Sequence, residues 1–204
     1  MTREEEYELV LKEQSGDSAS FEKLVLDNQT RVYNLALRMV GNEDDAFDMS
    51  QEAFIKAYNS IDTFRGDSRF SVWMYRLTTN VCLDFLRSRS RKAHSSLTYF
   101  DDEEDGGKEL EIPDERFSPE TLAEKKELRK AVVRGLKKLP ADYRAILLLR
   151  EIEGLSYEEI ADALELEAGT VKSRIFRARK KLCEILTADR NFYYISSSNK
   201  QKEV

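Results

Sequence analysis

The sequence has little proline, glycine, cysteine or histidine. Its 204 residues include 3 Pro, 8 Gly, 2 Cys and 1 His. Scarce proline and glycine favour helices over a turn-rich β fold. The two cysteines, Cys82 and Cys183, are far apart and are expected to be small buried hydrophobic residues. One histidine cannot build a zinc site or a Ser-His-Asp triad with the partners in view. We therefore expect no metal, no cofactor and no catalytic centre.

Long hydrophobic runs are also missing. The longest aliphatic run covers residues 145–149, which is far too short to span a bilayer. The first residues, MTREEEYELVLKEQ, lack the apolar segment of a signal peptide. We expect a cytoplasmic protein with no direct membrane insertion. Charged residues make up 35% of the chain and hydrophobic residues 41%, so it can bury a core of modest size.

An acidic segment divides the chain. Residues 101–115 carry nine acidic residues and one lysine, and glycine and proline occur in and around the segment. This composition is typical of a linker. The sequence therefore predicts an all-α protein with two small helical domains, residues 1–92 and 121–187. A flexible acidic linker, 93–120, joins them, and a polar tail, 188–204, follows.

The apolar periodicity predicts four helices in the first domain and at least four in the second. The first four are a helix capped by Asp17 or Ser18, a helix that carries residues 32–39 and stops at Gly41, a helix over 42–60, and a helix from a cap at Ser71 to about Ser90. In the second domain, the expected helices are 119–139, which Pro140 ends, 143–153, which Gly154 ends, and two more in the segment 156–182.

The segment 156–182 has the pattern of a helix-turn-helix. Ser156 and Glu159 form a capping-box pair at the start of its first helix. In the second helix, Val171, Ile175 and Ala178 belong to one apolar face. Residues 168–181 hold six Lys or Arg and no acidic residue, in a chain of formal net charge −6. Such a helix is suited to the major groove of DNA, and the alternative is a solvated cationic helix.

A second basic surface covers residues 62–92, with seven cations against three acidic residues. Its aromatic residues alternate with arginines, a combination that suits melted DNA because bases stack on rings and arginine contacts phosphates. The alternative is that the rings belong to the core. For Trp73 and Tyr75 the two interpretations carry equal weight, whereas for Phe85 the core is favoured.

The expected helix 42–60 carries an acidic stripe. Asp44, Asp48 and Glu52 recur every four residues, and Gln51 lies beside them. The stripe is either a docking surface for another protein or a solvated face. A carboxylate metal site is disfavoured because residues of a single helix cannot converge around an ion.

Four blocks of sequence, taken together, resemble the extracytoplasmic-function sigma factors of the sigma-70 family. These are DDAFDMSQEAFIKAY (44–58), FRGDSRFSVWMYRLTTNVCLDFLRSRSRK (64–92), LPADYRAILLLREIEGLSYEEIADAL (139–164) and AGTVKSRIFRARKKL (168–182). The resemblance implies a non-catalytic specificity subunit that directs core RNA polymerase to promoters in a stress response.

The resemblance also assigns residues to three surfaces. The surface for the clamp helices of the polymerase's largest subunit comprises Asp44, Asp45, Asp48, Gln51, Glu52 and Phe54. The minus-10 surface comprises Phe64, Arg65, Gly66, Asp67, Ser68, Trp73, Arg76, Asn80, Arg87 and Arg91, of which 64–68 and Asn80 would hold a flipped-out base. The minus-35 surface comprises Thr170, Lys172, Ser173, Arg174, Phe176, Arg177 and Lys180.

The chemistry of the minus-35 residues fits this assignment. Arg177 can make a bidentate contact to guanine, Ser173 can bond either base type, and Phe176 can touch a thymine methyl group. Thr170, Arg174 and Lys180 are better placed for phosphates. In the minus-10 surface, the arginines at positions 76, 87 and 91 would hold strand phosphates.

The chain departs from the family pattern at three positions. Phe47 stands where an acidic residue is more common, and Glu167 stands where proline is frequent. Glu165 replaces a common glycine at a turn position, and if that position needs a positive φ the replacement costs about 1 kcal/mol.

Two regulatory features follow from the resemblance. Acidic residues 101–105 could imitate RNA phosphates if the linker enters the RNA-exit channel, and a plain flexible tether is the alternative. The family's usual control is an anti-sigma partner, often membrane-bound, that covers both domains.

Two other function classes compete with a sigma factor. A stand-alone helix-turn-helix regulator would need a dimerisation helix or a ligand pocket, and neither is evident. An enzyme would need a phosphate loop, a metal cluster or a nucleophile–base pair, and the sequence has none of these patterns.

Overall fold

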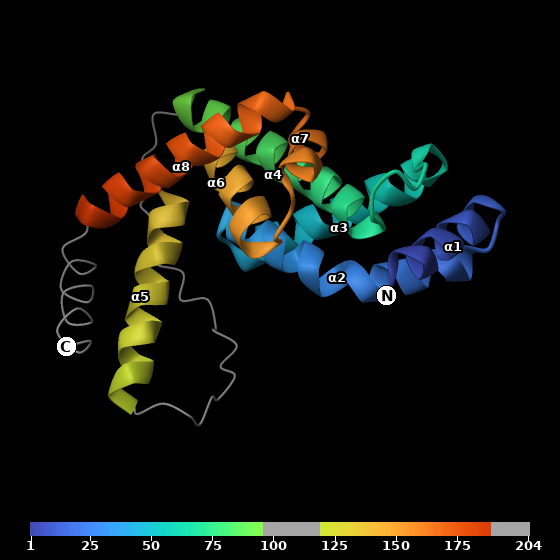
Figure 1. Ribbon diagram of the computed structural model, residues 1–204, viewed down its shortest axis with the longest axis horizontal. Helices are drawn as coiled ribbons and strands as arrows, with labels where there is room; N and C mark the ends of the chain where they lie inside the picture. Colours follow the sequence, from blue (N-terminus) through green and yellow to red (C-terminus); the bar gives the residue numbers. More distant parts are fainter. Residues whose placement is uncertain (96–118, 189–204) are drawn as a thin grey trace.

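The computed structural model describes residues 1–95 and 119–188, which are helical apart from short turns and contain no strand. The predicted all-α fold is therefore confirmed. Helices α1 to α4 lie within residues 1–95, and helices α5 to α8 lie within residues 119–188 (Figure 1). Most of the expected linker and the tail lie outside the described residues, so the predictions about their roles stay predictions.

The first module has four helices, but not the four that the sequence predicts. Helix α1 (Arg3–Gln14) was not predicted, because its only fully buried apolar side chain is Val10 and its apolar periodicity is weak. The two helices expected between positions 18 and 41 are one helix, α2 (Ser18–Val40). Polar residues in its middle do not break it, since the buried Asn28 amide donates to the Leu24 carbonyl at 2.9 Å.

Helices α3 (Glu43–Ser60) and α4 (Phe70–Ser95) pack on α2. Gly41 ends α2 with φ 79°, as the sequence predicts, and Asn42 caps α3. The prediction that Ser71 caps α4 is wrong. Helix α4 begins one residue earlier, and the N–H of Phe70 is bound by the Glu6 carboxylate of α1 at 3.1 Å.

The second module contains α5 (Pro119–Lys137), α6 (Ala141–Leu147), α7 (Tyr157–Leu164) and α8 (Ala168–Ala188). The predicted helix 143–153 is present, but its last part is a π-helical turn, η2 (Leu148–Ile152). Gly154 ends it with φ 72°. Of the two cysteines, Cys82 is buried as expected, whereas the prediction for Cys183 is wrong because its side chain is exposed on α8.

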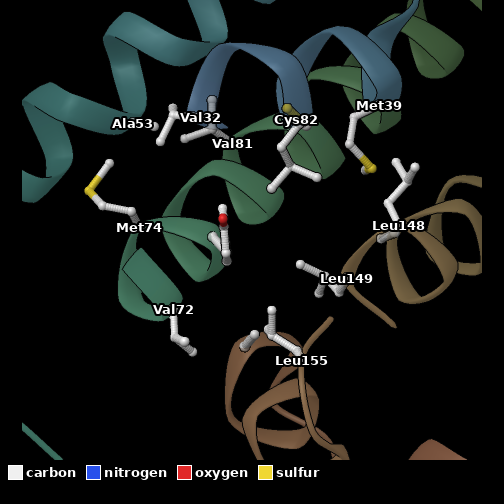
Figure 2. Packing of buried hydrophobic residues seen from close by; sticks show 14 of the residues in the cluster. Val32, Met39, Ala53, Val72, Met74, Val81, Cys82, Leu148, Leu149 and Leu155 are labelled. Atoms are coloured by element: carbon white, nitrogen blue, oxygen red, sulfur yellow. The ribbon is translucent and has the colours of Figure 1, made fainter. Parts of the chain in front are cut away.

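The two modules share one hydrophobic core. Met39 of α2 and Leu148 of η2 point toward one another, and Leu155 lies near Val72 of α4 (Figure 2). The buried Tyr75 of α4 faces Glu153, and burial together with the interaction with this carboxylate raises the pKa of the phenol. The second module therefore packs directly on α2 and α4.

Arg144 joins the modules through backbone carbonyls. Its side chain is buried in α6 and donates to Met39 O of α2, and also to the carbonyls at the end of α5 and beyond: Leu136 at 2.9 Å, Lys137 at 2.6 Å and Leu139 at 3.2 Å. Burial lowers the pKa of the guanidinium. Four carbonyls at or just beyond the ends of α2 and α5 thus share one cation.

Candidate nucleic-acid interface

The second helix of the helix-turn-helix, α8, separates a buried face from an exposed one. Val171, Ile175 and Ala178 are at most 2% exposed, as the periodicity predicts. On the opposite face, Phe176 is 69% exposed. The other exposed residues of the predicted minus-35 surface are Lys172, Ser173, Arg177 and Lys180, while Thr170 and Arg174 are half-buried.

The exposed side chains of α8 are ordered by bonds within the helix. Ser173 Oγ donates to the Thr170 carbonyl at 2.9 Å. The Arg177 guanidinium donates to the Ser173 carbonyl at 3.2 Å and to Ser173 Oγ at 3.1 Å. The two candidate base-reading residues, Ser173 and Arg177, are therefore next to each other on one side of the helix.

The turn between α7 and α8 has the strain that the sequence predicts. Ser156 and Glu159 form both bonds of the capping box at the start of α7. Glu165 ends this helix in the left-handed region, with φ 53° and ψ 48°, where a glycine would be unstrained. The Leu166 N–H donates to the Ala161 carbonyl at 2.8 Å and closes the turn. The expected cost of a non-glycine residue at this position therefore applies.

Seven of the ten residues of the predicted minus-10 surface line a hollow between α4 and the second module, whereas Gly66, Arg87 and Arg91 lie outside it. Trp73, Arg76 and Asn80 lie along α4, at spacings that place them on one side of a helix. The loop side chains Phe64, Arg65, Asp67 and Ser68 contribute to the same wall. The opposite wall is the end of α7 and its turn, including Ala161 and Glu165. The open space measures about 880 Å³.

Two of the candidate phosphate-binding arginines are paired with carboxylates of the second module. Arg76 contacts Glu165 at 2.7 Å, and Arg87 contacts Asp142 at 3.3 Å. Both pairs are exposed, so each is worth only about 0–1 kcal/mol. In this arrangement part of the minus-10 surface therefore lies opposite the second module, and only weak, exposed ion pairs link its arginines to that module.

The aromatic residues of the minus-10 surface divide between core and surface. Phe64 is 7% exposed, and its ring centroid lies 5.9 Å from that of Phe70 and 5.2 Å from that of Trp73. Tyr75 is also buried, whereas Trp73 and Phe85 are half-buried. Of the candidate cations, Arg65, Arg87 and Arg91 are exposed and Arg76 is half-buried. Phe64 thus lies at the base of the loop and supports the ring of Trp73.

The acidic stripe on α3 is exposed along its length. Asp44, Asp48, Gln51 and Glu52 all face solvent, Asp45 is half-buried and pairs with Arg89 at 3.1 Å, and Phe54 is half-buried. Two apolar side chains on the same face were not predicted to take part in docking: Ile55 is 59% exposed, and Phe47, noted only as a departure from the family pattern, is 54% exposed. Two apolar side chains within an acidic face are a combination that suits protein docking better than solvation.

Neither a membrane-crossing helix nor a metal cluster occurs in the described ranges. No helix there is long and apolar enough to cross a bilayer. Likewise, no three His, Cys, Asp or Glu side chains in these ranges gather in a way that could hold a metal ion.

Comparisons with known proteins identify the family. Residues 24–92 match the family model for Sigma-70 region 2, and residues 129–182 match that for Sigma-70, region 4. The chain is 40% identical over 186 residues to the RNA polymerase sigma-H factor of Pseudomonas aeruginosa, which covers 91% of this chain and 96% of the relative. It is 43% identical over 177 residues to the ECF RNA polymerase sigma-E factor of Escherichia coli K12, which covers 85% and 90%.

Two solved structures have a similar fold. One is the sigma factor RpoE in complex with the anti-sigma factor NepR from Bartonella quintana, with a TM-score of 0.61, 27% identity, and coverage of 83% of this chain and 98% of that one. The other is CnrH in complex with the cytosolic domain of CnrY, with a TM-score of 0.63, 26% identity, and coverage of 91% and 99%. The chain therefore belongs to the extracytoplasmic-function sigma factors of the sigma-70 family, which are specificity subunits of RNA polymerase.

Proposed function

We propose that this sigma factor divides promoter recognition between its two modules. In this proposal, residues 1–92 contact core polymerase and the melted minus-10 strand, residues 121–187 read the minus-35 duplex, and 93–120 link them. The observation that carries the proposal is the surface of α8, which buries its apolar face and exposes Phe176 among cations. An exposed aromatic ring between basic side chains is costly in solvent and useful in a groove.

The minus-35 contacts belong to the exposed face of α8. Arg177 would bond a guanine, Ser173 would bond a neighbouring base, and Phe176 would contact a thymine methyl group. Lys172 lies beside these side chains and would contact the same bases. Thr170, Arg174 and Lys180 would hold phosphates and set the position of the helix without specifying sequence.

Most of the minus-10 contacts belong to the hollow beside α4, and Arg87 and Arg91 would extend them farther along the helix. Asn80 has both a donor and an acceptor for the edge of a flipped-out base, and the loop 64–68 would surround that base. The half-buried Trp73 ring offers a stacking surface. Strand phosphates would replace Glu165 at Arg76 and Asp142 at Arg87, while Arg91 would bind a third phosphate.

This use of α4 requires the second module to move away. Helix α7 and its turn form one wall of the hollow, and a DNA strand could not lie along the arginines while their carboxylate partners remain. We infer that docking on core polymerase separates the modules. An anti-sigma partner would act by keeping them unavailable. Two similar proteins form such complexes, one with the anti-sigma factor NepR and one with the cytosolic domain of CnrY. These activities place the protein in the cytoplasm.

Core polymerase would dock on α3. The acidic residues of the stripe would pair with cations of the clamp helices of the largest subunit, and Phe54 would support the helix from its inner side. The exposed Phe47 and Ile55 add apolar area at the same face.

Run-off transcription on a pooled promoter library tests the function. Bacterial core polymerase with this protein is expected to initiate at defined sites that share two spaced elements. Asp48→Arg should abolish this initiation by preventing docking, whereas Glu8→Arg, an exposed change on α1 outside all three surfaces, should not. Absence of initiation, with the polymerase active on another sigma factor, would contradict the proposal and favour a stand-alone regulator that binds an operator without polymerase.

A further inference from the structure

The loop between α3 and α4, residues 61–69, begins with a single helical turn, η1 (Ile61–Thr63), and has few bonds of its own after it. The first turn of the loop is closed by the Phe64 N–H, which donates to the Ile61 carbonyl at 3.0 Å. The part that follows contains Gly66, which has a positive φ of 77°. The loop nevertheless includes most of the residues proposed to surround a flipped-out base, a role that needs a fixed backbone shape.

Helix α1 lies against this loop along one side. The side chains of Arg3, Glu6, Val10 and Gln14 occupy successive turns of α1, so they lie on one face. Val10 is buried in the core, and the other three bond the loop or the start of α4.

Gln14 holds the first part of the loop. Its amide nitrogen donates to the Ile61 carbonyl at 2.8 Å and to the Phe64 carbonyl at 3.1 Å. Both hydrogens of one amide group are thereby used, and the two carbonyls are fixed relative to each other.

Arg3 and Tyr7 hold the middle of the loop. The Arg3 guanidinium donates to the carbonyls of Gly66 at 2.8 Å and Asp67 at 3.0 Å. A Cβ at Gly66 would lie 2.4 Å from the Tyr7 ring, so the ring rests directly on the glycine backbone. Glycine is thus required both by its φ and by the contact with α1.

Glu6 holds the end of the loop. Its carboxylate is 4% exposed and accepts a hydrogen bond from the Phe70 N–H, the first residue of α4. This bond serves one of the N–H groups that a helix start leaves unpaired. It also fixes the point from which α4 carries Trp73, Arg76 and Asn80 into the hollow.

We propose that α1 is the positioning element of minus-10 recognition: Arg3, Glu6 and Gln14 hold the backbone of the loop in the shape that receives the flipped-out base. The three side chains together bind five backbone groups at Ile61, Phe64, Gly66, Asp67 and Phe70. The role rests on the proposed function, and none of the three residues needs to touch DNA. A loop ordered beforehand loses less conformational freedom when it binds, which strengthens both binding and discrimination.

The test uses the full chain in complex with core polymerase. Open-complex formation is measured by permanganate reactivity of unpaired thymines, on a promoter and on versions with each minus-10 base changed in turn. The double variant Arg3→Ala/Gln14→Ala is expected to lower open-complex formation about tenfold, since each lost bond is worth roughly two- to tenfold. It should also reduce the preference for the correct flipped-out base. Glu8→Ala and Lys12→Ala, exposed changes on α1, are the matched controls.

Two further readouts separate positioning from general support of the fold. Affinity for core polymerase and affinity for minus-35 duplex should stay within twofold of the unaltered chain. Glu6→Gln, which keeps an acceptor for the Phe70 N–H, should lose less open complex than Glu6→Ala.

Three results would overturn the proposal. One is a double variant that melts and discriminates like the control variants. Another is an equal loss of core binding, because α1 would then only support the module. The third is an unaltered chain that initiates nowhere with core polymerase, which would overturn the proposed function and this role with it. In contrast, normal initiation by the unaltered chain with undiminished discrimination by the double variant would remove the α1 role alone.

Discussion

The two DNA surfaces of this protein are built in different ways. On α8, the candidate base readers are ordered by partners three or four residues away, such as Ser173 with Thr170 and Arg177 with Ser173. On α4 and its loop, the partners are distant in sequence: Glu6 is 64 residues from Phe70, and Glu165 is 89 residues from Arg76. The α8 surface is therefore formed by one helix, whereas the α4 surface depends on α1 and on the position of the second module.

The largest effect is expected from removing the Arg144 hydrogen bonds that link the two modules. Arg144→Met would leave buried carbonyls of two helices without their donor, at a cost of about 3 kcal/mol. The change should loosen the second module from α2 while α8 keeps its own helical order. Thermal unfolding measures the loss, and small-angle scattering should show a larger radius of gyration. Arg150→Met, which removes one bond to the Leu155 carbonyl and a cation–π contact with the Tyr157 ring but no bond between the modules, is the control. A variant as stable and compact as the unaltered protein would show that Arg144 does not join the modules.

The next effect separates base reading from phosphate binding on α8. Arg177→Ala should reduce discrimination at one minus-35 base by about 1–3 kcal/mol. Lys180→Ala should weaken binding evenly over all sequences and lower the salt slope by about 1. Competition binding of holoenzyme to substituted promoters at several salt concentrations distinguishes them. An equal loss over all sequences for Arg177→Ala would refute its assignment as a base reader.

The turn at Glu165 links the two surfaces and offers a smaller effect. Glu165→Gly removes the strain of φ 53° and should stabilise the protein by up to about 1 kcal/mol. It also removes the partner of Arg76, so minus-10 DNA should bind more readily. Glu165→Ala removes the same ion pair but keeps the strain, so it should share the DNA effect without the gain in stability. Unfolding midpoints and binding to a fork promoter measure the two. Equal midpoints for the two variants would mean that the left-handed turn carries no cost.

The smallest effect concerns the pH dependence of stability. Burial raises the pKa of Glu6 above its ordinary value, although the bond from the Phe70 N–H acts in the opposite direction. Because the folded state holds this proton more tightly, stability should fall as pH rises from the ordinary pKa of a glutamate through the raised one. Glu6→Gln should flatten that slope, and Glu8→Gln, a change at an exposed site, should not. Denaturant unfolding at a series of pH values provides the comparison. A slope unchanged in Glu6→Gln would assign the pH dependence to other groups.

Sequence reasoning was most accurate where bonds are local. The capping box of Ser156 and Glu159, the end of α2 at Gly41 and the left-handed turn at Glu165 depend on residues only a few positions apart, and all three are confirmed. It was less accurate where polar residues are buried in the interior of the protein. Helix α1 was missed, and the single helix α2 was divided, because buried Glu6 and Asn28 look like surface residues in a pattern of apolar positions.

The sequence by itself determined the helical class, the helix-turn-helix and the face that α8 exposes. These features follow from periodicity and capping, since a helix sets which of its own residues share a side. Only the tertiary structure decided that Phe64 is buried, that Arg144 serves carbonyls of two modules, and that Arg76 faces Glu165. Each of these depends on which helices pack together. The sequence around a cation or an aromatic ring does not reveal which distant residue becomes its partner.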